Sequence, residues 1–329
     1  MHIDTSAPTR VDLAGGTIDI WPLYLFHDGA QTIHFAISLR AHARLTPRED
    51  GRVAIESLDT GARVESPGPH GLHTAPGMAL LGRLVEHFGA RGVTLTTRAE
   101  SPAGAGIAGS SAMNVAVCAA LARWQRVDID AESLIELAKN VEAQAIRVPT
   151  GLQDFRPAMY GGIAALELGP AHATRVALDV DPLELSRRVV LAYTGEPRDS
   201  GTNNWDIFKK HLDGDRAVFD RFERIRDTAA SLRAALERSD WDEVGVQIAA
   251  EWENRKRLAP GVTTPAIEAL IARATAAGAR AAKVCGAGGG GCLVCYSDPS
   301  SRAAVRDALL AGGARVLEYR IETEGLRLG

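Results

Sequence analysis

The chain has 329 residues and a formal net charge of −4 at pH 7, with 46% hydrophobic and 24% charged residues. It is too long for one domain of ordinary size and too apolar for a disordered chain, so we expect two globular domains. The mildly acidic balance excludes a global field that would attract nucleic acid or an anionic membrane. No run approaches the roughly 18 apolar residues of a membrane span, and the polar start MHIDTSAPTR does not resemble a signal peptide.

The composition also includes four cysteines and more glycine than usual. Cys292-x-x-Cys295 has a spacing known from zinc and redox sites, but its alternating apolar context favours buried structural thiols in a reduced, cytoplasmic protein. The 33 glycines follow no repeat. They exceed the usual share of about 7%, so their positions are informative.

The first half alternates between strand and helix patterns. Strands are predicted at 9–14, 34–45, 52–57, 62–65 and 92–99. Helices are predicted at 76–88, from the glycine-rich turn to 125, and at 130–147 with Asp130 or Ser133 as N-cap. The segment PTGLQDFRPAMYGG at 149–162 is predicted to be a loop because proline and glycine bound it.

The second half contains a long helical region between two groups of strands. Strands are predicted at 163–168, 189–194, 281–285, 291–296 and 315–321. Three or four helices are predicted at 207–276 and one at 300–311, whereas 195–205 is polar and turn-rich. We expect a domain boundary near Pro182.

The segment SPAGAGIAGSSA joins a predicted strand to a predicted helix. Its Gly104-x-Gly106-x-x-Gly109 pattern is typical of dinucleotide-binding turns. It also approaches a Walker A loop, but Ser110 stands where that loop has its lysine. In both cases small residues let backbone N–H groups approach an anion at the positive end of a helix. A tight turn with a serine N-cap is the alternative that needs no ligand.

Two further segments favour a ligand site. The run GAGGGG at 286–291 lies between apolar strands, where glycine is costly unless a backbone or a ligand approaches closely. The third segment is RVDLAGGTID at 10–19. Together PTRVDLAGGTID, SPAGAGIAGSSA and KVCGAGGGGCLV resemble the three motifs of the GHMP kinase superfamily, over residues 8–295. GLQDFRPAMYGG resembles the branch that holds galactokinase and the bacterial D-glycero-D-manno-heptose 7-phosphate kinases. The second motif is one residue longer than the usual pattern.

The resemblance implies an α+β, two-domain GHMP kinase fold. It places an N-terminal domain, like a domain of a ribosomal protein, at 1–182, and a ferredoxin-like α+β C-terminal domain at 183–329. It implies ATP and Mg²⁺ as cofactors and a small-molecule acceptor, in a monomer or homodimer that binds neither nucleic acid nor membrane. The expected reaction is phosphoryl transfer to a hydroxyl of a sugar or sugar phosphate.

The same resemblance assigns the site residues. It implies that Asp154 and Arg10 are catalytic, the arginine holding the aspartate ionised. Glu142, twelve residues before Asp154, is expected with Ser111 at the metal, although a lone helical glutamate is otherwise a solvated residue. The nucleotide set is Gly104, Ala105, Gly106, Gly109, Ser110, Ser111, Ala112, Gly288 and Gly289. The acceptor set is Asp19, Gly16, Gln153, Arg198, Asn204 and Trp205.

Several alternatives stay open at this point. The acceptor set contains the polar segment 195–206, which could equally be a solvated turn before a helix. Another acceptor within the superfamily would make the chain a mevalonate-type kinase or a related decarboxylase. A dinucleotide-dependent oxidoreductase would explain the first glycine pattern but not the second glycine run. A ligand-sensing pseudokinase would not require Arg10, Glu142 and Asp154 together.

Overall fold

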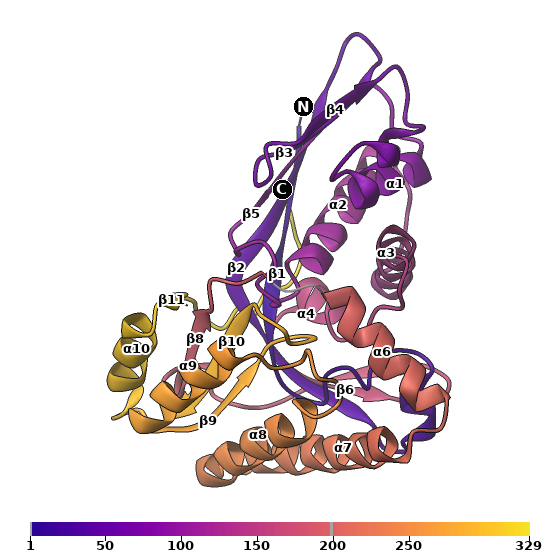
Figure 1. The fold of residues 1–329 in the computed structure, drawn as a ribbon. Helices are drawn as coiled ribbons and strands as arrows, with labels where there is room; N and C mark the ends of the chain where they lie inside the picture. The colour runs from indigo at the N-terminus through magenta and orange to yellow at the C-terminus, as the bar shows by residue number, and fades with distance from the viewer. Residues whose placement is uncertain (1, 198–199) are drawn as a thin grey trace.

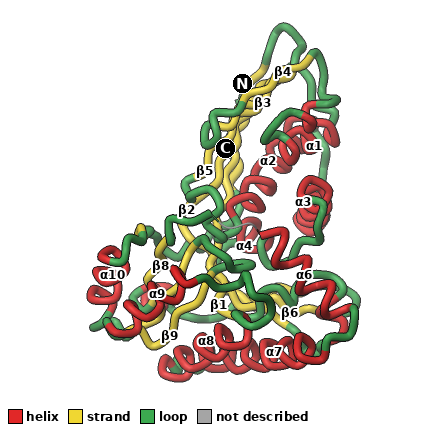
Figure 2. The backbone as a smooth tube through the Cα atoms, viewed as in Figure 1, coloured by secondary structure: helices red, strands yellow, loops and turns green. Residues whose placement is uncertain are grey.

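The frame of this computed structural model is a pair of sheets, shown with their helices in Figures 1 and 2. The structure describes residues 2–197 and 200–329, with the backbone alone described at 200–203. The larger sheet has eight strands: β1 (Ile3–Ala14), β2 (Gln31–Pro47), β3 (Val53–Ser57), β4 (Arg63–Ser66), β5 (Val93–Ala99), β6 (Ile163–Leu168), β7 (Ala173–Ala177) and β12 (Arg327–Leu328). Its order is β12-β1-β2-β5-β3-β4, with β6 paired to β2 and β7 to β6.

Helices cover one side of the larger sheet (Figure 1). They are α1 (Ala79–Phe88), α2 (Gly109–Gln125), α3 (Ala131–Ile146) and the short α4 (Phe155–Tyr160). Every residue of α2 from Ser111 to Ala122 is buried, so this helix has no polar face. Its alanine-rich sequence lets it pack between the sheet and the outer helices. Asp130 caps α3 by accepting a hydrogen bond from the Ser133 amide at 2.9 Å, as predicted.

The smaller sheet has the order β11-β8-β10-β9. Its strands are β8 (Val189–Tyr193), β9 (Ala279–Val284), β10 (Cys292–Ser297) and β11 (Arg315–Val316). The helices of this half are α5 (Pro182–Ser186), α6 (Ser200–Leu212), α7 (Arg216–Glu237), α8 (Trp241–Arg255), α9 (Pro265–Ala276) and α10 (Arg302–Ala311). Two short 3₁₀ helices, η1 (Leu23–Phe26) and η2 (Leu72–Thr74), lie in loops of the first half.

The sheets share buried contacts. One apolar cluster joins β1 and β2 to β8, β10 and α7, through residues such as Val11, Phe35, Leu191 and Leu232. The β1–β2 pair is the longest in the molecule and keeps Arg10 opposite Ala36.

Three predicted elements differ from the structure. Residues 195–205 were predicted as a turn-rich loop, but α6 already begins at 200 because TNNWDIFKKHL has helical apolar spacing. The loop predicted at 149–162 contains α4, which ends at Gly161. The strand predicted at 315–321 is only two residues long. Beyond it the chain runs back to the larger sheet, where the amide of Glu322 donates to Ala36 O at 2.9 Å and β12 pairs with β1.

The boundary expected near Pro182 falls between β7 and β8, and the division at 1–182 and 183–329 stays a prediction. The final residues attach to the first half of the chain and not to the smaller sheet. All four cysteines are buried and none is in a disulfide among the described residues, which confirms structural thiols. Burial raises the pKa of the Cys295 thiol to about 12, so it stays protonated. None of the helices in the described ranges is long and apolar enough to cross a membrane.

Candidate active site

Arg10 and Asp154 form a charged pair at the centre of the candidate site. β1 carries Arg10 into the interior, where its side chain is 1% exposed, and Asp154 immediately precedes α4. Nε and Nη2 of Arg10 donate to Oδ1 of Asp154 at 3.0 and 2.5 Å. Nη1 donates to Gly106 O at 2.9 Å, and the backbone amide of Arg10 donates to Ile107 O at 3.0 Å. One arginine therefore joins the first motif, the second motif and the loop that carries Asp154.

Asp12 extends this pair into a buried charge network. Its Oδ1 accepts from Arg10 Nη1 at 3.3 Å and from the Gly286 amide at 2.9 Å, while its Oδ2 accepts from Lys283 Nζ at 2.7 Å. Burial alone would raise the pKa of Asp12, but Lys283 and Arg10 lower it far below its ordinary value. Burial alone would lower the pKa of Arg10, but Asp154 and Asp12 raise it. Both groups therefore stay charged.

The second motif lines a cavity of about 410 Å³ at the start of α2. α2 begins without a side-chain cap, and Ala108 precedes it with φ of 60°. An uncapped helix start presents backbone N–H groups to an anion. Six residues of the predicted nucleotide set line this cavity: Gly104, Ala105, Gly106, Gly109, Ser110 and Ser111. Ala112 is buried and does not line this cavity. Its amide donates to Ala108 O at 3.0 Å and is therefore already used within the helix.

Both serines of the second motif contact Glu142 from α3. Ser110 Oγ donates to Glu142 Oε1 at 2.7 Å, and Ser111 Oγ donates to Oε2 at 3.0 Å. Ser110 is exposed, whereas Ser111 is 2% exposed and lies deeper. All three residues line the same cavity. Hydroxyl and carboxylate oxygens are hard ligands of the kind that Mg²⁺ takes beside phosphate oxygens, so the donor set fits this metal.

A smaller cavity of about 40 Å³ lies beside the charged pair. Asp19 lines it and accepts from the Gln153 amide through Oδ2 at 2.9 Å. Burial and the charge of Asp154 raise the pKa of Asp19 to about 6. Two further lining residues, Gln153 and Asn204, have buried side-chain oxygens without a hydrogen-bond partner. Buried polar atoms are rarely left unsatisfied, so these oxygens point to hydrogen-bond donors of a ligand.

The third motif packs against the second. A Cβ at Gly291 would lie 2.7 Å from Ala105 O, and the Cys292 amide donates to that oxygen at 2.7 Å. Gly291 has φ of 84°, a conformation that favours glycine. Gly286 and Ala287 line the smaller cavity. The three motifs and the Asp154 loop therefore meet in one place.

Comparison with known proteins also finds matches in both halves of the chain. The family models described as GHMP kinases N terminal domain and GHMP kinases C terminal match residues 77–162 and 232–315. The chain belongs to the GHMP kinase family. It is a small-molecule kinase, and the GHMP resemblance inferred from the three motifs is confirmed.

Its relatives include kinases of sugars and of mevalonate. The D-glycero-alpha-D-manno-heptose 7-phosphate kinase of Campylobacter jejuni is 28% identical, over 99% of this chain and 98% of that protein. The mevalonate kinase of Thermococcus sibiricus is 26% identical, over 100% of this chain and 98% of that protein. The crystal structure of a putative sugar kinase from Campylobacter jejuni superposes with a TM-score of 0.79 at 25% identity, over 100% of this chain and 98% of that one.

Some residues predicted for this GHMP kinase site lie elsewhere. Gly288 and Gly289 line neither described cavity; a Cβ at Gly288 would lie 2.4 Å from Val262 O, and the Gly289 amide donates to that oxygen at 2.9 Å. These glycines thus allow close packing of two backbone segments. Gly16 also lines neither described cavity and packs against the guanidinium of Arg255.

Two acceptor candidates, Asn204 and Trp205, lie on α6. Trp205 is 46% exposed and stacks on Phe208, with ring centroids 5.7 Å apart, and lines neither described cavity. Arg198 lies outside the described residues. Asn204, by contrast, lines both cavities of this kinase.

The inner residues of the charge network were not predicted from the sequence. Asp12 and Lys283 are fully buried and stand inside the first and third motifs, where their charge was a usable signal. Glu251 and Arg255 are buried on α8, with Arg255 Nη1 donating to Glu251 Oε1 at 3.0 Å. A glutamate and an arginine four residues apart are common on exposed helices, so no sequence signal set this pair apart.

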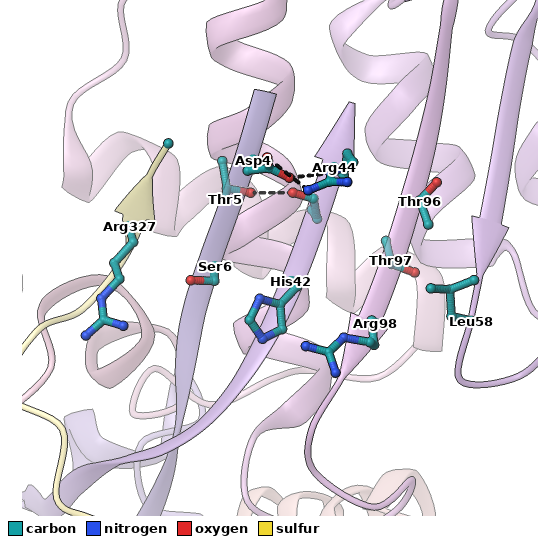
Figure 3. Close-up of a pocket in the computed structure, with 12 residues that line it drawn as sticks. Asp4, Thr5, Ser6, His42, Arg44, Leu58, Thr96, Thr97, Arg98 and Arg327 are labelled. Carbon is teal, nitrogen blue, oxygen red and sulfur yellow. Dashed lines mark hydrogen bonds and ion pairs between the residues drawn. The ribbon is translucent and has the colours of Figure 1, made fainter. Parts of the chain in front are cut away.

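A third concavity, of about 490 Å³, lies on the larger sheet near both chain ends (Figure 3). Two of its charged groups pair with each other, since Arg44 Nε donates to Asp4 Oδ1 at 2.6 Å, and His42 lies 2.9 Å from Glu100 outside the concavity. The described residues that line it include none from the motifs. This face of the kinase is therefore not assigned to the reaction.

Proposed function

We propose that this GHMP kinase transfers the terminal phosphoryl group of ATP, with Mg²⁺, to a hydroxyl of a sugar phosphate of the heptose phosphate class. One observation carries the proposal: Asp154 lines both cavities, and Arg10 holds it between them. Phosphoryl transfer requires the donor phosphate and the acceptor hydroxyl to meet in line at one point. Asp154 lies at that point.

The larger cavity is the proposed nucleotide site. Backbone N–H groups around Gly106 and at the start of α2 would bind the phosphates. Ser110, Ser111 and Glu142 would hold Mg²⁺, because both serine hydroxyls already contact the Glu142 carboxylate. The metal would neutralise charge on the phosphate oxygens during transfer.

The charged pair is the proposed catalytic centre. Asp154 accepts a hydrogen bond from the acceptor hydroxyl and orients or takes its proton. Arg10 fixes the Asp154 carboxylate through two hydrogen bonds and, at the junction of the cavities, would balance charge on the transferring phosphoryl group. Asp12 and Lys283 keep the arginine in place through the contacts described above.

The polar groups of the smaller cavity favour a polyhydroxylated acceptor. Four hydrogen-bond acceptors line it: the carboxylates of Asp19 and Asp154 and the unpartnered oxygens of Gln153 and Asn204. Hydroxyl groups can donate to such oxygens, which favours an acceptor that carries several hydroxyl groups. The long, full-coverage relationship to the Campylobacter heptose 7-phosphate kinase supports the same class.

A coupled ADP-release screen tests this proposal. The purified chain is assayed with ATP and Mg²⁺ against aldoses, uronic acids, heptose phosphates and mevalonates. We expect release with a heptose phosphate and little with mevalonate. Asp154→Ala is the matched inactive variant, and Asp128→Ala, an exposed aspartate, is the control.

The outcomes separate the alternatives. Release with mevalonates but not with sugars would replace the acceptor class. Binding of a nicotinamide nucleotide without stabilisation by ATP would replace the kinase chemistry. Release that is unchanged in Asp154→Ala would refute the role of Asp154.

A further inference from the structure

Arg255, the last residue of α8, reaches the acceptor cavity although it belongs to no motif. Its side chain is 2% exposed and lines the same cavity as Asp19 and Asp154. A buried guanidinium requires compensating partners, because an unpaired buried charge is strongly unfavourable. The partners of Arg255 show which segments of the chain this side chain connects.

The guanidinium contacts three separate segments. Nη1 donates to Glu251 Oε1, within α8, at 3.0 Å. Nη2 donates to Thr17 Oγ1 in the first motif at 3.2 Å and to Gly286 O in the third motif at 2.5 Å. A planar fork with several N–H groups can serve three acceptors at fixed angles, which an ammonium on a flexible stem cannot reproduce.

The turn of the first motif is shaped around this guanidinium. A Cβ at Gly16 would lie 2.2 Å from Nη1 and 2.8 Å from Cζ of Arg255, so any side chain there would displace it. Thr17 is buried and has φ of 72°, which is unfavourable for a β-branched residue. Such a conformation persists only when its surroundings determine it, and Arg255 binds its hydroxyl.

We propose that Arg255 is a positioning residue for the acceptor. It fixes the turn at Gly16 and Thr17 against the third motif and thereby sets the position of Asp19, two residues further on. Asp19 in turn accepts from the Gln153 amide, next to Asp154. The kinetic part of this inference rests on the proposed function, whereas the structural part does not.

The structural part is tested by hydrogen exchange. Arg255→Lys keeps a positive charge beside Glu251 but loses the fork, and Gly16→Ala displaces the guanidinium from the other side. In both variants we expect amide exchange in peptides covering 14–21 and 150–154 to accelerate about tenfold or more. Peptides of α2 should be unchanged. Arg257→Ala is the matched control, because Arg257 is an exposed arginine at the end of the same helix, paired with Glu253.

The kinetic part is tested on the same variants. We expect the KM for the acceptor to rise about tenfold or more, because a displaced positioning group costs at least this much. The KM for ATP should stay within about twofold, and Arg257→Ala should match the unaltered chain. An unchanged exchange pattern and acceptor KM in Arg255→Lys and Gly16→Ala would overturn the proposal. Equal rises in both KM values, with faster exchange throughout, would also overturn it by showing a general folding role.

Failure of the proposed function has a different signature. If the unaltered chain releases ADP with none of the acceptors, the sugar phosphate kinase proposal fails. The exchange comparison then still decides whether Arg255 holds the turn, since it needs no acceptor.

Discussion

Replacing Asp19 by asparagine should stabilise the protein near neutral pH and raise the KM for the acceptor. Asp19 is 1% exposed. Burial and the charge of Asp154 raise its pKa from the ordinary 3.8 to about 6. Asparagine keeps the oxygen that accepts from the Gln153 amide at 2.9 Å and removes only the charge. The substitution therefore isolates the cost of holding a carboxylate in this cavity.

The sign and size of the stability change follow from the difference between the pKa of Asp19 in the folded and in the unfolded state. The folded state binds the proton of Asp19 more tightly than the unfolded state, so ionisation of this group disfavours folding. The cost is absent well below pH 4, grows between pH 4 and 6, and is constant above it. At about 1.4 kcal/mol for each tenfold change in proton affinity, the difference between 3.8 and about 6 corresponds to about 3 kcal/mol.

Scanning calorimetry of Asp19→Asn and the unaltered chain measures this cost. An unfolding entropy of about 2.1 cal/mol/K per residue gives about 0.7 kcal/mol/K for this chain. A gain of about 3 kcal/mol then raises Tm by about 4 °C at pH 7.5. At pH 4.5 the calculated gain falls below about 2 °C.

The control is Asp128→Asn, which alters an exposed aspartate and should leave the pH dependence of Tm unchanged. The acceptor KM of Asp19→Asn should rise while its Tm rises. A Tm difference between Asp19→Asn and the unaltered chain that is the same at pH 4.5 and 7.5, or a lower Tm in the variant at pH 7.5, would refute the reasoning.

Four further outcomes are expected. Asp154→Asn should lower kcat about 100-fold or more in the ADP-release assay, because the acceptor hydroxyl loses the carboxylate that orients its proton. ATP should still raise Tm, because the second-motif backbone proposed to bind its phosphates is unaltered. Glu142→Gln should raise the Mg²⁺ concentration for half-maximal rate about tenfold or more, as a Mg²⁺ titration would show. Lys283→Met should destabilise the fold by about 3–5 kcal/mol in urea unfolding, because Asp12 keeps a buried charge without its closest cation. Ala108→Gly should raise the unfolding free energy by about 1 kcal/mol in the same assay, because φ of 60° is unfavourable for alanine.

The proposed phosphate-binding loop was predictable from the sequence because backbone N–H groups, and not side chains, would bind the phosphates. Glycine is the residue that close approach and positive φ require, so the segment from Gly104 to Gly109 is visible in the sequence. The pair Arg10 and Asp154 was found through its motif context, and the structure brings them to hydrogen-bond distance. Much of the local structure was also predicted, since periodic segments such as α3 and β5 carry their own signals.

Other parts were not predictable because their causes are tertiary. α6 was expected to begin later, since serine, glycine and asparagine at 200–204 favour turns when considered alone. Gly288 was expected at the nucleotide, but Val262 on another loop is the reason that it has no side chain. Arg255 gave no signal at all, because only folding brings the end of α8 to Thr17.

The charge network explains why the two halves of the chain have to meet before the site exists. Arg10 serves Asp154 and Asp12 at once, and Asp12 also binds Lys283 and the Gly286 amide from the smaller sheet and its loop. Removing the second half would leave Asp12 with one cation and Arg10 without a fixed position. The glycine loops can therefore indicate phosphate binding from sequence alone, whereas the acceptor depends on side chains that converge only in the assembled fold.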